Sequence, residues 1–261
     1  MSIIDNWLAP GSTDYVVGNF MYDPYTAQAT GTLANIVAVG GGVCWMICYA
    51  LIIYRAIKDK KVIMPMFVLG LNFAWEFCYA FVYDYCIPVQ RVVNALWFLL
   101  DCGLLFFKFK YCKEDFKATF PGANTKWAPW YTLGMLVAGS IVVYMSYYDF
   151  GDPQGITSAF IQNTFISAMI LSQWYRSGKT IDGTSMGVAL FKAFGTLAPI
   201  VLGVFYVIAT GGLAELGSTM VSVQVMCVTI ILCDWIYIIN LYKRFKELGL
   251  NPWTRKPLSQ K

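Results

Sequence analysis

Seven apolar stretches, each as long as a membrane-crossing helix, constrain the fold of this chain more than any other feature. A hydrocarbon core about 30 Å thick is crossed by about 20 helical residues. A helix also satisfies its own backbone hydrogen bonds in lipid. We therefore predict an all-α integral membrane protein, a bundle of seven transmembrane helices. The predicted spans are residues 32–57, 62–83, 88–107, 128–148, 154–175, 188–210 and 217–242.

The charge content supports a lipid-facing surface. Only 13% of the 261 residues are charged, whereas 58% are hydrophobic. A soluble domain carries about 25% charged residues, so this chain has too few to cover a surface that faces water. The connections between the stretches are short, and none holds a soluble domain.

The basic residues predict the orientation. If seven spans alternate across the bilayer, Arg91 is the one of the 19 lysines and arginines that falls on the outer side. Positive flanks stay cytoplasmic, so the N-terminus is predicted outside and the C-terminus in the cytosol. Residues 1–31 then form an extracytoplasmic or luminal segment and a candidate cap, residues 32–242 the catalytic bundle, and residues 243–261 a basic cytosolic tail. The host membrane is a bacterial plasma membrane or a fungal endoplasmic reticulum.

The chain contains no histidine. This excludes serine or cysteine triads that use an imidazole, histidine-bound zinc and imidazole proton shuttles. Nucleotide-binding glycine loops and zinc-type cysteine spacings are also missing. We expect no cofactor and no metal, and acid–base chemistry is left to carboxyl, tyrosine, cysteine or lysine groups.

Three acids lie deep inside predicted spans: Glu76, Asp101 and Asp234. A charged side chain at a helix centre costs about 3 kcal/mol or more on insertion scales, so such residues suggest function. We predict no basic residue at comparable depth and therefore no ion pair inside the bilayer. Because desolvation disfavours the charged form, these acids are expected to be protonated and able to donate a proton.

Helical spacing places polar neighbours beside these acids. Asn72 and Glu76 are four residues apart, and Asn94, Trp97 and Asp101 also share one helical face. We expect a cavity among the second, third, fifth and seventh spans. An alternative stays open, in which the amides and Asp101 only link neighbouring helices by hydrogen bonds. The predicted supporting or pocket residues are Asp101, Asn72, Trp75, Asn94, Trp97, Trp235 and Tyr237.

The stretch Asn72-Phe73-Ala74-Trp75-Glu76 in the second span, with Asp234 in the last, resembles the small integral-membrane terpene cyclases of meroterpenoid and indole-terpenoid biosynthesis. The resemblance implies that Glu76 and Asp234 are catalytic and together protonate a terminal epoxide or alkene of a prenyl chain. The resulting cation would drive ring closure until a proton is lost. Asp101 would shape the site.

The residues are compatible with that chemistry. Acid-initiated cyclisation needs a desolvated acid, apolar walls that exclude water, and aromatic faces that stabilise a cation. Aspartate-rich magnesium motifs and the DxDD acid motif are missing. The expected partners are the bilayer and a lipophilic prenylated substrate with an aromatic, indole or polyketide head. We expect a monomer that binds no nucleic acid.

A proton-coupled transporter or channel is the main alternative. Buried acids in short-looped spans are also typical of proton-coupled carriers, and Asp101 with Glu76 would then form a proton relay. Small carriers usually show an internal repeat, which is not evident between the first and last three spans. A retinal protein is disfavoured because the seventh span contains no lysine.

Overall fold

A computed structural model describes residues 24–83, 88–150, 152, 155–210 and 218–258. Over these residues the fold is all-helical, and the only β feature is an isolated bridge between Leu250 and Pro257. A π-helical turn continues α3, and a 3-10 turn precedes α6. The elements are α2 (Pro24–Asp59), α3 (Met66–Phe77), the π turn (Cys78–Val82), α4 (Pro88–Lys110), α5 (Cys112–Thr119), the 3-10 turn (Thr125–Trp127), α6 (Ala128–Phe150), α7 (Ile156–Arg176), α8 (Met186–Thr210) and α9 (Ser218–Glu247).

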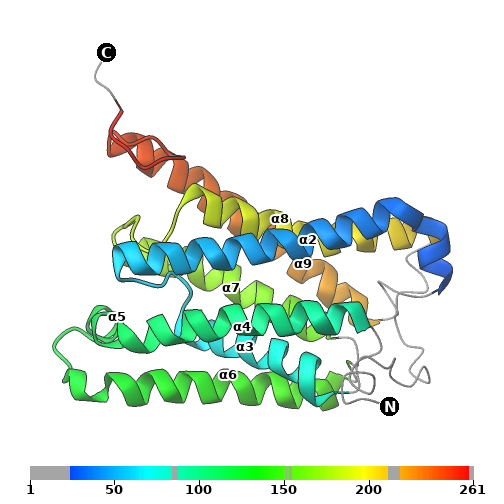
Figure 1. Cartoon of the computed structure of the whole chain (residues 1–261), viewed down its shortest axis with the longest axis horizontal. Helices are drawn as coiled ribbons and strands as arrows, with labels where there is room; N and C mark the ends of the chain where they lie inside the picture. Colours follow the sequence, from blue (N-terminus) through cyan, green and yellow to red (C-terminus); the bar gives the residue numbers. More distant parts are fainter. Residues whose placement is uncertain (1–23, 84–87, 151, 153–154, 211–217, 259–261) are drawn as a thin grey trace.

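The long helices run lengthwise as a bundle (Figure 1). Helix α2 packs along α8, α3 packs along α6, and α7 packs along α9, while α4 contacts both α2 and α3. Each of the seven predicted stretches corresponds to one of these long helices, with α3 and its π turn forming the second. The bundle therefore brings α2, α3, α4, α7, α8 and α9 around a shared interior.

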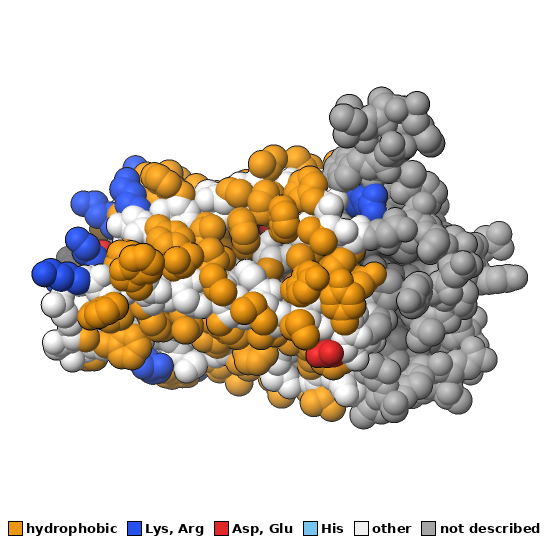
Figure 2. All heavy atoms as spheres, turned by 90° about the horizontal axis from the view of Figure 1, so that it is seen from below, with side chains coloured by type: hydrophobic (Ala, Val, Ile, Leu, Met, Phe, Trp, Pro, Cys, Tyr) orange, Lys and Arg blue, Asp and Glu red, His pale blue; other side chains and the backbone are white. Residues whose placement is uncertain are grey.

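In the part of the chain that the structure describes, four helices are long and apolar enough to cross a membrane: Val39–Asp59, Gln90–Lys110, Thr125–Phe150 and Ser222–Glu247. Two shorter apolar helical segments are Met66–Val82 and Met186–Val201. Hydrophobic side chains cover most of the described part of the face in Figure 2, and lysine and arginine gather mainly at the end where α5 lies. These features are those of an integral membrane protein.

The first described helix begins at Pro24, eight residues before the predicted span at residue 32, and the candidate membrane span within it is Val39–Asp59. Residues 24–31 continue the helix, and Gly31 does not interrupt it. The rest of the candidate cap, residues 1–23, lies outside the described residues.

Asp59 joins three segments at the basic end of the bundle. Its carboxylate pairs with Arg55 on the same helix and with Arg255 of the tail, whose Nη1 lies 2.9 Å from Asp59 Oδ2. The Gly183 amide donates to the same oxygen at 2.9 Å, and Arg255 also donates to the Thr184 carbonyl. The tail after α9 is therefore folded against the loops beside it.

Glycines allow a close contact between α6 and α3. A Cβ atom added to Gly139 of α6 would lie 2.7 Å from the Phe67 carbonyl oxygen and the Leu71 nitrogen of α3. The two backbones therefore touch, as small residues permit between membrane helices. This contact fixes α3, the helix that carries Asn72 and Glu76.

Candidate functional site

The first buried polar group, here called the acid cluster, consists of Tyr49, Asn72, Glu76 and Asp101. The Tyr49 hydroxyl donates to Glu76 Oε1 at 2.8 Å. Asn72 Nδ2 lies 2.9 Å from the same oxygen, 2.7 Å from Asp101 Oδ2 and 2.6 Å from the Tyr49 oxygen. The two carboxyl groups are 1% and 0% exposed. Helices α2, α3 and α4 thus place both acids within hydrogen-bonding distance of the Asn72 side-chain amide.

The acid cluster has no cationic partner. No ion pair among the described residues includes Glu76 or Asp101. Glu76 Oε2 and Asp101 Oδ1 are buried without a hydrogen-bond partner. Two neighbouring carboxylates repel each other, and desolvation penalises both charges. This arrangement therefore favours a state in which the pair retains at least one proton.

The second buried group, here called the ion-pair cluster, consists of Ser167, Lys192 and Asp234. Lys192 Nζ donates to Asp234 Oδ1 and to Ser167 Oγ. The prediction that no basic residue lies beside the buried acids was therefore wrong for Asp234. In the sequence, Lys192 lies near the start of its predicted span, which suggests a position toward the basic end. In the structure it lies within α8, and its side chain is buried beside α7 and α9.

The two predicted catalytic acids belong to separate clusters. Glu76 contacts Tyr49 of α2 and is linked through Asn72 to Asp101 of α4. Asp234 contacts Lys192 of α8. No hydrogen bond among the described residues joins Glu76 to Asp234. The structure therefore gives the two acids different surroundings, one with a second carboxyl group and the other with an ammonium group.

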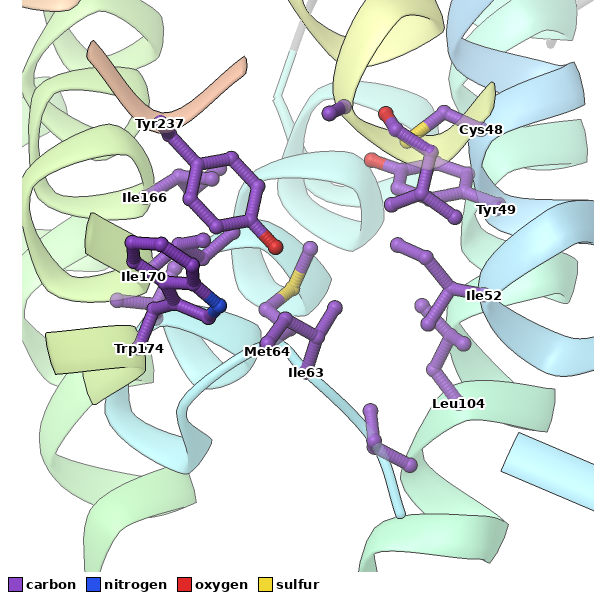
Figure 3. Packing of buried hydrophobic residues seen from close by; sticks show 14 of the residues in the cluster. Cys48, Tyr49, Ile52, Ile63, Met64, Leu104, Ile166, Ile170, Trp174 and Tyr237 are labelled. Atoms are coloured by element: carbon purple, nitrogen blue, oxygen red, sulfur yellow. The ribbon is translucent and has the colours of Figure 1, made fainter. Parts of the chain in front are cut away.

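A small cavity adjoins the ion-pair cluster. The cavity has a volume of about 20 Å³, which is room for about one water molecule. Lys192, Asp234 and Ser167 contribute polar lining, while the apolar lining includes Trp45 and Met64. Figure 3 shows Tyr237 and Trp174 on one side of this buried region, Cys48, Tyr49 and Ile52 on the other, and Met64 between them.

Trp45 and Tyr49 connect the two clusters along α2. Their ring centroids are 5.5 Å apart, Trp45 lines the cavity with Asp234, and Tyr49 binds Glu76. Gly195 of α8 makes room for the indole, because a Cβ atom there would lie 2.6 Å from Trp45 Cδ1. Two neighbouring aromatic rings of α2 therefore lie between the two clusters.

Two of the predicted pocket residues lie elsewhere. The Trp235 side chain is 42% exposed, so its predicted pocket role was wrong; it follows Asp234 on α9 and lies on the outward face. The Trp75 indole donates to the Gly155 carbonyl and Ser158 Oγ, both at 3.0 Å. It thus fixes the start of α7, and it does not line the cavity beside Asp234.

The other predicted residues are buried or partly buried between helices. Tyr237 lines the cavity, and its hydroxyl lies 2.8 Å from Thr184 Oγ1. Asn94 is fully buried and accepts a hydrogen bond from Gln90. Trp97 is partly buried, and its Nε1 is without a partner. Asn94 and Trp97 make no hydrogen bond to the acid cluster.

Sequence reasoning missed Tyr49, Lys192, Ser167 and Trp45. Lys192 had a detectable signal, since it is a lysine inside an apolar stretch. Tyr49, Ser167 and Trp45 had none, because hydroxyl and aromatic residues are frequent throughout these helices. Only the packing of α2 and α7 against their neighbours identifies them.

A family model described as Pyr4-like transmembrane terpene cyclases matches residues 19–247. The chain belongs to this family. The match includes every residue of both clusters, and several relatives are named terpene cyclases. The terpene cyclase resemblance found at Asn72–Glu76 is thereby confirmed at the level of the family.

Curated relatives share shorter stretches with this terpene cyclase family member. The Pyr4-family terpene cyclase mfmH of Annulohypoxylon moriforme is 29% identical over 163 residues, 60% of this chain and 64% of the relative. Terpene cyclase dpasB of Apiospora sacchari is 38% identical over 76 residues, 29% of this chain and 30% of the relative.

Asnovolin H synthase nvfL of Aspergillus novofumigatus is 28% identical over 114 residues, 44% of this chain and 42% of the relative. In none of these three relatives does the aligned stretch reach two thirds of the relative's length. No solved structure is detectably similar to the chain.

Proposed function

We propose that this protein is a membrane-bound terpene cyclase that protonates a terminal epoxide or alkene of a prenylated substrate and thereby starts cationic ring closure. The acid cluster carries this proposal. It holds two desolvated carboxyl groups without a cation, beside aromatic side chains, in a member of a terpene cyclase family. An acid that is kept protonated away from water is a suitable general acid for such a substrate.

Glu76 is the proposed proton donor. Tyr49 and Asn72 hold its Oε1, which leaves Oε2 as the oxygen without a partner. The proton passes from this carboxyl group to the epoxide oxygen or the terminal alkene carbon. The epoxide C–O bond breaks, or the alkene π bond is used, and a carbocation forms. Neighbouring double bonds then attack the cation and close rings. The last cation loses one proton, which replaces the proton that Glu76 donated, so no oxidant is required.

Asp101 and the aromatic residues support that step. Asp101 shares the Asn72 amide with Glu76, so its charge state sets how readily Glu76 loses a proton. Trp45 and Tyr49 present π faces beside the acid cluster, and such faces attract a cation. Asp234 was predicted to share the donation, and that role stays a prediction; we propose Glu76 as the donor here because Asp234 is paired with Lys192.

The proposed topology is a seven-span bundle with an outer N-terminus and a cytosolic C-terminus. Seven long helices lie side by side (Figure 1), and most basic side chains on the face in Figure 2 lie at one end of the bundle. A lipophilic prenylated substrate with an aromatic, indole or polyketide head would enter from the surrounding bilayer. Embedding the enzyme in lipid gives it access to such a substrate without transfer through water.

The decisive experiment measures ring formation in membranes that contain the protein. The substrates are prenylated phenols and indoles, each with and without a terminal epoxide. Glu76→Gln is expected to lower turnover by about 100-fold or more, since a general acid contributes about 10²–10⁴. Asp101→Asn is expected to lower it less. Glu247→Gln, an exposed glutamate on α9, is the matched control and should keep full turnover.

Full turnover in folded Glu76→Gln would refute Glu76 as the donor. The transporter alternative is tested in parallel with the purified protein in liposomes. Proton or solute flux without any ring product from the substrate set would favour the transporter. Products from the wild type, with no flux, would favour the cyclase.

A further inference from the structure

The ion-pair cluster has unused hydrogen-bonding capacity. A lysine ammonium carries three donors, and Lys192 uses two of them, on Ser167 and Asp234. Asp234 accepts through Oδ1, and none of the hydrogen bonds among the described residues uses its Oδ2. One donor and one acceptor therefore remain side by side.

The cavity beside the pair suits a small polar group. Its volume of about 20 Å³ corresponds to roughly one water molecule or one hydroxyl group. Thr184 and Tyr237, which also line it, already bond to each other through their hydroxyl groups. Lys192 and Asp234 are thus lining residues that have a donor and an acceptor available.

A structural role alone is a poor explanation for this pair. Buried ion pairs contribute little to stability, since replacement by well-packed apolar residues is often neutral or stabilising. Among the described residues, no printed hydrogen bond joins Lys192 to the acid cluster. A lysine and an aspartate held together inside an apolar bundle therefore indicate a ligand.

We propose that Lys192 and Asp234 bind a hydroxyl group on the head of the substrate, phenolic or enolic in type, and so select the head group while Glu76 starts the reaction. This inference rests on the proposed cyclase function. A hydroxyl group accepts from the Lys192 ammonium and donates to Asp234 Oδ2 at the same time. An indole N–H only donates, and a methyl ether only accepts, so either would leave one member of the pair unmatched.

The geometry of α2 fits a substrate that spans both clusters. Trp45 lines the hydroxyl cavity, and Tyr49, whose ring lies 5.5 Å away, binds the proposed donor. A head held at the ion-pair cluster directs its prenyl chain past these rings toward Glu76. The neutral pair also leaves the proton on Glu76 undisturbed, because it adds no net charge beside the acid cluster.

The test compares two substrates that differ by one methyl group: a prenylated phenol with a terminal epoxide and its O-methyl ether. We expect the wild-type enzyme to prefer the free phenol by about 10- to 100-fold in kcat/KM, the range for a hydrogen bond to a charged group. The double variant Lys192→Met/Asp234→Ala removes both charges and adds no volume at either position. Its preference should fall to within about threefold, mainly through a higher KM for the phenol.

Lys108→Met is the matched control, because Lys108 is also buried and paired, with Asp115, but at the basic end. Its substrate preference should equal that of the wild type.

Equal use of phenol and ether by the wild type would overturn the inference and leave the cyclase proposal intact. A preference that survives in the double variant would overturn it too. If the wild type cyclises neither substrate nor any prenylated indole, both proposals fail. The wild-type comparison needs no variant, so a double variant that fails to fold does not prevent the test.

Discussion

At the scale of single residues, Tyr49 connects the acids of the acid cluster. Its hydroxyl donates to Glu76 Oε1 and lies within hydrogen-bonding distance of Asn72 Nδ2. An amide nitrogen carries two hydrogens, yet Asn72 Nδ2 faces three oxygens. Tyr49 therefore supplies a donor that the amide cannot supply alone, and it fixes which oxygen of Glu76 stays free.

Tyr49→Phe is expected to lower kcat about 10- to 100-fold while the enzyme remains folded. Loss of the hydroxyl removes one hydrogen bond to a buried carboxyl group, worth about 1.5–3 kcal/mol. Ring-product formation in membranes measures the effect. Tyr54→Phe, an exposed tyrosine on the same helix, is the control. If both variants turn over equally, Tyr49 does not position the acid.

Helical spacing predicted part of the acid cluster. Asn72 and Glu76 meet because they are four residues apart on α3, a contact set by the helix itself. Contacts between helices could not be derived in this way. The Asn72–Asp101 and Lys192–Asp234 contacts depend on the rotation of α3, α4, α8 and α9 about their axes, which apolar periodicity leaves undetermined when a helix is hydrophobic on all sides.

At the scale of helices, the contact between α3 and α6 positions the proposed donor. Gly70 and Gly139 let the two backbones approach, and a Cβ atom on Gly139 would fall 2.9 Å from the Gly70 carbonyl carbon. The atoms that this Cβ would meet belong to the backbone of α3 and cannot move aside as a flexible side-chain end could. A methyl group there must separate the helices.

Gly139→Ala is expected to destabilise the bundle by about 1–3 kcal/mol, the usual cost of overpacking. For a chain of this size that corresponds to a Tm lower by about 2–6 °C, measured by thermal unfolding in detergent. Gly134→Ala on the same helix is the control, since its added Cβ meets nothing within 4 Å. Equal Tm values for the two variants would contradict the backbone contact.

Helix positions were largely predictable, but their ends and interruptions were not. The seven apolar stretches fall on the seven long helices, because the length of apolar sequence decides where a helix forms in lipid. The π turn at Cys78–Val82 and the early start of α2 at Pro24 were not predicted. Both depend on local packing and backbone contacts that a hydropathy pattern does not encode.

At the scale of the whole molecule, the bundle has distinct ends. At the basic end, Asp59 ties α2, the loop at Gly183 and the tail at Arg255 together. The acid cluster and the ion-pair cluster lie between helices inside the bundle. The contacts of Asp59 at one end hold the helices that carry the two clusters in a fixed position relative to one another.

The orientation of the bundle can be tested on α6, whose two ends carry exposed residues. Lys126 precedes the helix at the basic end, and Asp149 lies at the other end. Positive residues stay cytoplasmic, so Lys126 should face the cytosol and Asp149 the lumen.

In sealed microsomes with the cytosolic face outward, a membrane-impermeant maleimide should label Lys126→Cys at once, above the background of the unaltered chain. Asp149→Cys should be labelled only after detergent is added. The reverse pattern would invert the proposed topology, and labelling of both without detergent would show that α6 does not cross the membrane.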